Sequence, residues 1–195
     1  MKSKKRIAIF ATGSGSNAEV MMRYFQSHPK IEVSFLLSNK PEAGVLQHAK
    51  KYQVPTFVFN RDLFFNSENV LNQLKEKDID FIVLAGFLWK IPDYLIAAYP
   101  NRIINIHPAL LPKFGGKGMY GIHVHEAVKA AGEQESGITI HLVNENYDEG
   151  KILLQEKVRI LPEDNAVTIA KKVLQLEHAH FSPLVEKYIL ETISA

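Results

Sequence analysis

The amino-acid sequence predicts an α/β fold: a single domain built on a doubly wound, mostly parallel β-sheet flanked by helices. In the N-terminal half, short apolar runs alternate with segments of helical periodicity, which is the order of parallel sheets. The run FIVLAGF at residues 81–87 lacks polar side chains, as a central strand covered on both faces would. The run TGSGSN at residues 12–17 joins the first strand to the first helix through glycines, which is typical of a Rossmann-like half.

Each predicted strand is a short apolar run, and each predicted helix has apolar residues three or four positions apart. Strands are expected at residues 6–12, 31–37, 55–59, 81–87 and 102–106, and helices at residues 17–26, 43–52, within 66–76 and at 93–98.

The chain changes character after this half. The segment KFGGKGMYG at residues 113–121 has four glycines in nine residues and predicts a mobile loop. A short helix is expected at 125–131, followed by strands at 137–143 and 151–160 around the turn-rich segment NENYDEG. The last helix is expected to begin near Asp164, because acidic side chains favour a helix N-terminus. A break is expected near Pro183, because proline lacks the backbone N–H that a helix interior needs.

Composition narrows the class of protein. The 195 residues contain 23 basic and 21 acidic side chains mixed along the chain and no cysteine. The lack of cysteine excludes disulfides, thiolate nucleophiles and cysteine-ligated metal sites. There is no apolar stretch of about 18 residues for a membrane span and no basic stripe for nucleic acid. We therefore expect one cytoplasmic domain, residues 1–195, that acts on small molecules as a monomer or homodimer, without membrane or nucleic-acid partners.

The first glycine loop fits the dinucleotide pattern G-x-G-x-x-G/A through Gly13, Gly15 and Ala18. Backbone N–H groups of such a turn, together with the helix N-terminus, favour a phosphate. An NAD site also needs an acidic residue about 20 positions on. That position reads LSNK, and the nearest acid, Glu42, follows a proline. A phosphate monoester on a small substrate therefore fits better than a dinucleotide.

A plain strand-to-helix turn is the alternative for this loop. In that case Ser16 or Asn17 would serve as the helix N-cap, because a short polar side chain accepts a backbone N–H there.

A second candidate site is the segment IINIHPALLP at residues 103–112. Asn105 and His107 are two positions apart, so on a strand they point to the same side. They lie near the carboxyl end of that strand, where open α/β sheets bind ligands. An amide donor beside an imidazole can stabilise an oxyanion and move a proton. The alternative is a hydrogen-bonded core asparagine and a histidine that ends the strand.

A carboxylate would complete this pair, because a nearby acid raises the pKa of a histidine. Asp148 is the best candidate, since it lies in the loop between two strands, and Glu145 and Glu149 are rivals. No metal is expected: paired histidines two positions apart do not share a helix face, and H-E-x-x-H is absent.

Five ordered segments carry a resemblance to a known family: TGSGSN, LAGFLWKIP, INIHPALLP, SGITIHLVNENYDEGKILLQEKV and LQLEHAHFSPL. Together they resemble the folate-dependent formyltransferases over almost the whole chain. The resemblance implies the formyltransferase fold. It also implies transfer of a formyl group from the cosubstrate 10-formyltetrahydrofolate to the amine of glycinamide ribonucleotide, a step of purine synthesis.

The resemblance also implies residue roles. Asn105 and His107 would contact the developing oxyanion, His107 would donate a proton to the leaving folate nitrogen, and Asp148 would keep His107 charged. The ribonucleotide would be held by Gly15, Ser16, Asn17 and Glu177, and the folate by Arg61, Leu88, Trp89, Lys90, Ile91 and Asn105.

Other readings of the binding residues stay open. Glu177 on an amphipathic helix would ordinarily be solvated, Arg61 could be a plain surface residue, and Leu88 and Ile91 could be core. Family members often have arginine where Trp89 stands here. The loop at 115–121 is longer than usual and is expected to act as a lid.

Two alternative functions remain. One is another folate-dependent formyltransferase, such as one acting on a sugar amine. The other is a non-catalytic nucleotide-binding module, which would not need Asn105, His107 and Asp148 together.

Overall fold

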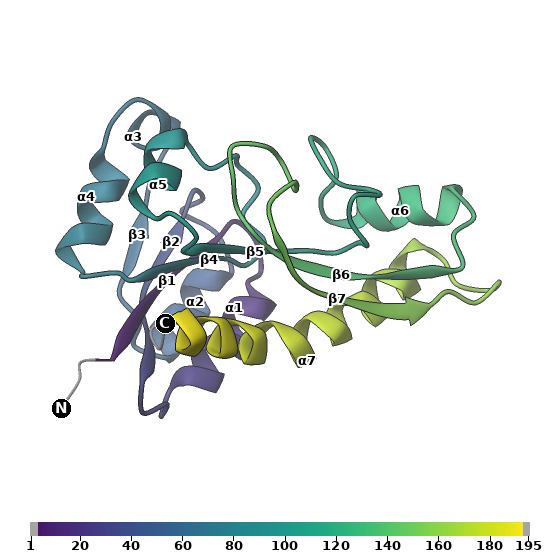
Figure 1. Cartoon of the computed structure of the whole chain (residues 1–195), viewed down its shortest axis with the longest axis horizontal. Helices are drawn as coiled ribbons and strands as arrows, with labels where there is room; N and C mark the ends of the chain where they lie inside the picture. Colours follow the sequence, from purple (N-terminus) through teal and green to yellow (C-terminus); the bar gives the residue numbers. More distant parts are fainter. Residues whose placement is uncertain (1–3, 193–195) are drawn as a thin grey trace.

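The computed structural model describes residues 4–192 and contains one seven-stranded sheet with the strand order β3-β2-β1-β4-β5-β6-β7 (Figure 1). The strands are β1 (Lys5–Ala11), β2 (Ile31–Ser38), β3 (Thr56–Val58), β4 (Phe81–Leu84), β5 (Ile103–His107), β6 (Glu135–Leu142) and β7 (Ile152–Arg159). The helices are α1 (Ser16–Phe25), α2 (Val45–Lys51), α3 (Arg61–Phe65), α4 (Asn69–Glu76), α5 (Asp93–Ala98), α6 (Ile122–Ala130) and α7 (Ala166–Thr192).

The first five strands are parallel, whereas β6 runs antiparallel to β5 and β7 runs antiparallel to β6. The predicted α/β class with a mostly parallel, doubly wound sheet is therefore confirmed. From β1 the chain winds outward through β2 and β3, then returns to place β4 on the other side of β1. This reversal opens a crevice at the carboxyl ends of β1 and β4, where ligands bind in such sheets.

Both faces of the sheet are covered. Ile7 and Ile9 of β1 belong to the hydrophobic cluster that includes buried residues of α1, α2 and α7. Ala8 and Phe10 belong to a second cluster with buried residues of α3, α4 and α5. Alternate residues of one strand thus face two cores, which explains why its sequence is a continuous apolar run.

Several predicted boundaries were wrong for local reasons. β4 ends at Leu84 rather than at residue 87, because Gly86 has a φ of +77° and turns the chain out of the sheet. The short helix α3 was not predicted, although Asn60 caps it by accepting the N–H of Leu63 at 3.0 Å.

The predicted break near Pro183 does not occur, because α7 runs unbroken through that proline. Packing explains this, since Phe181, Ser182 and Val185 around the proline are all buried. A proline removes one helical hydrogen bond and costs about 3 kcal/mol, which burial of several apolar side chains can offset. The helix begins at Ala166, where Asn165 accepts the N–H of Thr168 at 3.0 Å.

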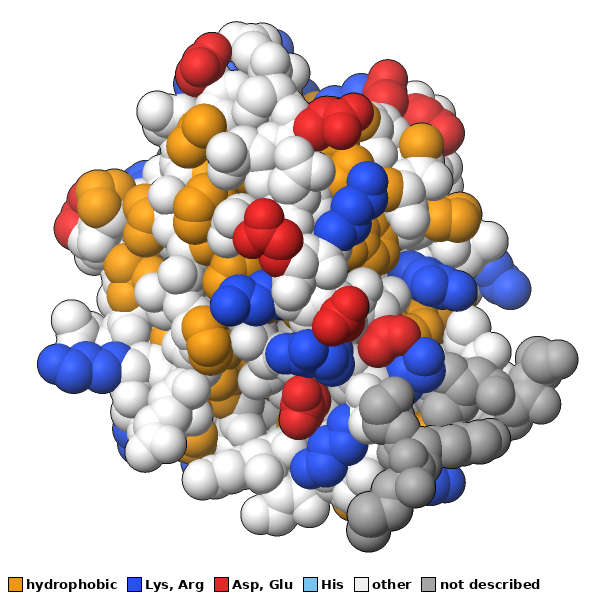
Figure 2. Space-filling view, turned by 90° about the vertical axis from the view of Figure 1, so that its left-hand side faces the viewer, with side chains coloured by type: hydrophobic (Ala, Val, Ile, Leu, Met, Phe, Trp, Pro, Cys, Tyr) orange, Lys and Arg blue, Asp and Glu red, His pale blue; other side chains and the backbone are white. Residues whose placement is uncertain are grey.

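On the face shown in Figure 2, side chains of both charge signs are interspersed among apolar ones. Among the described residues, no helix is both long and apolar enough to cross a bilayer.

The close approach of β6 and β7 generates a stability prediction at Gly137. A Cβ at this position would lie 2.0 Å from the carbonyl oxygen of Glu156 and 2.8 Å from Leu110. We expect Gly137→Ala to destabilise the fold by about 1–3 kcal/mol, the usual cost of overpacking. Thermal unfolding should show a lower Tm. The matched control is Gly13→Ala, whose Cβ meets nothing within 4 Å; equal Tm values for both variants would contradict this account of the sheet.

Candidate functional site

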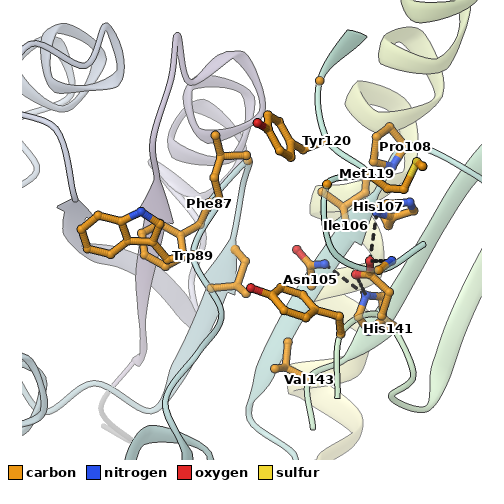
Figure 3. A pocket seen from close by; sticks show the side chains of 18 of the residues that line it. Phe87, Trp89, Asn105, Ile106, His107, Pro108, Met119, Tyr120, His141 and Val143 are labelled. Atoms are coloured by element: carbon orange, nitrogen blue, oxygen red, sulfur yellow. Dashed lines mark hydrogen bonds and ion pairs between the residues drawn. The ribbon is translucent and has the colours of Figure 1, made fainter. Parts of the chain in front are cut away.

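A cavity of about 730 Å³ opens at the carboxyl ends of the central strands. Its size is within the usual range of small-molecule sites, about 300–1,000 Å³. The walls come from the segment after β4, the end of β5, the loop before α6, the segment after β6, and α7 (Figure 3).

Asn105 and His107 lie in the C-terminal part of β5, and both line the cavity. Asp148 comes from the loop between β6 and β7, and its Oδ2 atom lies 3.6 Å from Nδ1 of His107. The three groups selected from the sequence therefore meet at one wall, whereas Glu145 and Glu149 are not among the cavity-lining residues. Asp148 itself has a φ of +56°, a left-handed conformation that aspartate tolerates better than most residues.

The glycine-rich loop before α6 is tied to these groups. Nε2 of His107 donates a hydrogen bond to the carbonyl oxygen of Phe114 at 2.7 Å. The backbone N–H of Gly116 donates to Oδ2 of Asp148 at 2.9 Å. The loop thus fixes the ring tautomer of His107 and supports the carboxylate.

Burial decides the protonation of this pair in the ligand-free protein. It lowers the pKa of His107, and it outweighs the charge of Asp148 and the carbonyl of Phe114, which both act to raise that pKa. The expectation of a raised pKa at this histidine was therefore wrong. Burial also acts to raise the pKa of Asp148, but the neighbouring imidazoles of His141 and His107 and the N–H of Gly116 together hold it below its usual value. An ionised carboxylate faces a ring that loses its proton readily.

The glycine turn after β1 reaches the cavity through two of its residues, Ser14 and Asn17. Gly15, not Ser16 or Asn17, is the N-cap of α1, and no side chain caps this end. The alternative of a side-chain-capped turn was therefore wrong. Gly15 is required, because its φ is +79° and a Cβ would lie 2.3 Å from Val45. Ser14 and Asn17 line the cavity, whereas Gly15 and Ser16 are not among its lining residues.

Glu177 of α7 joins this turn, because its Oε2 atom accepts a hydrogen bond from Nδ2 of Asn17 at 2.6 Å. Glu177 is only 8% exposed and lines the cavity, so the solvated alternative was wrong. Burial raises the pKa of this carboxyl, and the bond from Asn17 only partly offsets the effect. The side-chain oxygen of Asn17, Oδ1, is also buried, and it has no hydrogen-bond partner in the protein.

The segment after β4 forms the opposite wall, where Leu88, Trp89, Lys90 and Ile91 all line the cavity. Ile91 is a core residue as well, whereas Leu88 is 43% exposed. Arg61 does not line the cavity. Its guanidinium lies 5.0 Å from the ring of Phe65 and 5.4 Å from that of Trp89, so the tryptophan connects it to the cavity wall.

Two cavity histidines were missed from the sequence. His141 of β6 lies beside Asn105, and His125 of α6 is buried with an unpartnered Nδ1 atom. His141 stands immediately before the acidic loop at the end of an apolar strand, a signal that was available. Within residues 4–192, no group of three or more potential ligand side chains is arranged to hold a metal ion.

The family model described as formyl transferase matches residues 5–185. A chloroplastic phosphoribosylglycinamide formyltransferase of Arabidopsis thaliana is 40% identical over 93% of this chain. The chain spans 64% of the length of that protein and 62% of the length of a cowpea (Vigna unguiculata) relative. A phosphoribosylglycinamide formyltransferase of Bacillus subtilis is 33% identical, with 95% of both chains covered.

Solved structures agree with these relatives. The phosphoribosylglycinamide formyltransferase of Bacillus halodurans superposes with a TM-score of 0.84 at 38% identity, covering 94% of each chain. The enzyme of Brucella melitensis gives a TM-score of 0.84 at 38% identity, covering 95% of this chain and 96% of its own. Sequence and fold together show that this chain belongs to the formyl transferase family.

Proposed function

We propose that this protein transfers the formyl group of 10-formyltetrahydrofolate to the amine of glycinamide ribonucleotide, giving formylglycinamide ribonucleotide and tetrahydrofolate. The observation that carries the proposal is the meeting of Asn105, His107 and Asp148 in one cavity with an uncapped helix N-terminus. The names of the relatives at 33–40% identity support the same reaction.

The chemistry needs neither a metal nor a covalent nucleophile. The amine nitrogen attacks the formyl carbon, the C=O bond becomes a C–O⁻ single bond, and a tetrahedral intermediate forms. The amide N–H of Asn105 and, once protonated, the ring of His107 stabilise this oxyanion, a contribution that typically amounts to about 10²–10³ in rate per donor. Collapse of the intermediate breaks the bond to the folate nitrogen.

The path of the transferred proton is inferred from the geometry of His107 and Asp148. The attacking amine becomes acidic once its nitrogen is bonded to the carbon, and the neutral ring of His107 takes up its proton. Asp148, 3.6 Å away, stabilises the imidazolium so formed. The imidazolium then protonates the leaving folate nitrogen, so the ring ends as it began.

The two substrates occupy opposite walls. The dianionic phosphate of the ribonucleotide lies at the turn of Gly15, Ser16 and Asn17, where the α1 dipole favours negative charge. Glu177 accepts hydrogen bonds from the ribose hydroxyls. The folate lies along residues 88–91, with Arg61 reaching its glutamate tail from the ring of Trp89. The glycine-rich loop at 115–121 closes over the ribonucleotide, and the protein acts as a cytoplasmic monomer or homodimer; these two points stay predictions.

A turnover assay tests the reaction and its three catalytic groups. Purified protein mixed with both substrates should release tetrahydrofolate, followed by absorbance. Asn105→Ala should lower kcat by about 10²–10³ through loss of an oxyanion donor. His107→Ala and Asp148→Asn should lower it by about 10²–10⁴ through loss of proton transfer.

The matched control is His123→Ala, because His123 is an exposed histidine of the same protein outside the cavity lining. Wild-type rates in all three catalytic variants would remove the proposed mechanism. Turnover of a sugar amine in place of the ribonucleotide would favour the alternative of a sugar-amine formyltransferase. Binding without turnover would favour a non-catalytic nucleotide-binding module.

The protonation of His107 gives a pH prediction. Its folded pKa should lie below the ordinary value of about 6.5, measured by NMR titration of the labelled ring. Because the unfolded chain then binds this proton more readily than the folded chain, the site lowers stability as pH falls below about 6.5. Asp148→Asn should move the folded pKa further down, since the carboxylate charge acts to raise it. A midpoint above 6.5 in the ligand-free protein would contradict the proton-uptake step.

Glu177→Gln should separate binding from stability. The raised pKa of the carboxyl means that its ionisation destabilises the fold as pH rises through that pKa. Glutamine can still accept the hydrogen bond of Asn17, so the Tm of the variant should exceed that of wild type by an amount that grows as the pH rises above the ordinary carboxyl pKa of 4.5. Affinity for the ribonucleotide should fall by about 10- to 100-fold, as expected for a lost charged hydrogen bond. The control is Glu163→Gln, which replaces an exposed carboxylate and should change neither the Tm nor the affinity for the ribonucleotide. A Glu177→Gln protein that is less stable than wild type at pH 8 would contradict this account of the buried carboxyl.

A further inference from the structure

His141 is a cavity residue that the reaction as described does not use. It lies on β6 directly opposite Asn105 in the antiparallel ladder with β5. Cross-strand partners in such a ladder point to the same face with neighbouring Cβ atoms. His141 is 2% exposed, so its ring is held by protein contacts alone.

One of those contacts fixes the tautomer of the ring. Nδ1 of His141 lies 2.8 Å from the carbonyl oxygen of Leu142. A carbonyl oxygen can only accept, so Nδ1 carries the hydrogen, and Nε2 of the neutral ring carries a lone pair. Gly150 permits this position of the carbonyl, because a Cβ there would lie 1.7 Å from the Leu142 oxygen.

The lone pair faces the amide of Asn105, whose Nδ2 atom lies 3.1 Å from Nε2. An amide nitrogen carries two hydrogens. Nε2 accepts one of them, which fixes the plane of the amide and leaves the other hydrogen for a ligand. A reversed amide would set its oxygen against the lone pair, two acceptors facing each other at a buried position, which costs free energy.

The carboxylate of Asp148 lies between the ring of His141 and that of His107. Its Oδ1 atom lies 3.5 Å from Nε2 of His141, and its Oδ2 atom lies 3.6 Å from Nδ1 of His107. One negative charge thus stands between two imidazoles.

We propose that His141 is a positioning residue that accepts one hydrogen of the Asn105 amide and thereby directs the other at the formyl oxygen of the substrate. This inference rests on the proposed formyl transfer. It assigns His141 no contact with the reacting atoms, and it explains how an amide that could turn over is kept in the orientation that oxyanion stabilisation needs.

Two variants of one position test it in the turnover assay. The side-chain oxygen of glutamine reaches approximately the place of Nε2, whereas that of asparagine reaches only the place of Nδ1. His141→Asn should lower kcat by about 10²–10³, as if the oxyanion donor itself were lost, with both KM values little changed. His141→Gln should recover most of that loss. Equal losses in the two variants would overturn the proposal.

A double-mutant cycle identifies the residue through which His141 acts. In the Asn105→Ala background, His141→Asn should add little further loss. In the Asp148→Asn background, the loss from His141→Asn should persist. The opposite pattern would assign the effect of His141 to the carboxylate, and equal losses in every background would assign it to general stability; either result refutes the inference.

An NMR measurement on the ligand-free protein tests the inference independently of the proposed function. In the ligand-free wild type, ¹⁵N-labelled His141 should show a protonated Nδ1 and an unprotonated Nε2 at pH 7.5, and the side-chain amide signals of Asn105 should shift in His141→Asn. A charged ring, or unshifted amide signals, would sink the positioning role even if formyl transfer is observed. Lack of turnover by the wild type with the predicted amide shift would instead refute the substrate assignment.

Discussion

The site depends on one carboxylate, Asp148, held between two buried imidazoles. An isolated ionised carboxylate in such a place would be very costly. The backbone N–H of Gly116 donates a hydrogen bond to this carboxylate, and the two rings lie 3.5 and 3.6 Å from its oxygens. Hydrogen bonds at the same wall fix the tautomer of His107 and the plane of the Asn105 amide.

The antiparallel edge of the sheet makes this arrangement possible. A sheet that stayed parallel would bring each new strand to the cavity only after a full crossover. Here β6 returns alongside β5, so His141 faces Asn105 and Thr139 faces His107 in one register. The loop that follows β6 then carries Asp148 back over the carboxyl end of β5. The parallel strands supply the glycine turn after β1, the segment after β4 and, from β5, Asn105 and His107. The antiparallel edge supplies His141 and the loop that carries Asp148.

The sequence was sufficient for the parallel half of the fold because strands buried on both faces read as continuous apolar runs. It was insufficient where tertiary packing overrides local preference, as at Pro183, whose helix is held by buried neighbours on both sides. Asn105 and His107 could be paired by strand periodicity alone. Asp148 could not be separated from Glu145 and Glu149 in that way, since all three lie in one polar loop and only the resemblance and the three-dimensional contacts favour it.

His141 shows the limit most clearly. Its proposed role rests on a cross-strand register and on a carbonyl that fixes one ring nitrogen, and neither is encoded in local periodicity. Arg61 illustrates another limit, because its family position predicts a folate contact, whereas its guanidinium lies 5.4 Å from the ring of Trp89 and outside the cavity lining. The direction of the His107 pKa was missed for the same reason, since the degree of burial cannot be read from a motif.

The most direct test of the account is a crystal structure of the protein with a stable tetrahedral analogue that joins a folate-like ring to the ribonucleotide. The account places the oxygen of the tetrahedral centre about 2.7–3.1 Å from Nδ2 of Asn105, the distance expected of an oxyanion donor, with the His107 ring on the same side. An analogue bound with that oxygen directed into solvent, or with the ring of His107 turned away from the tetrahedral centre, would contradict it.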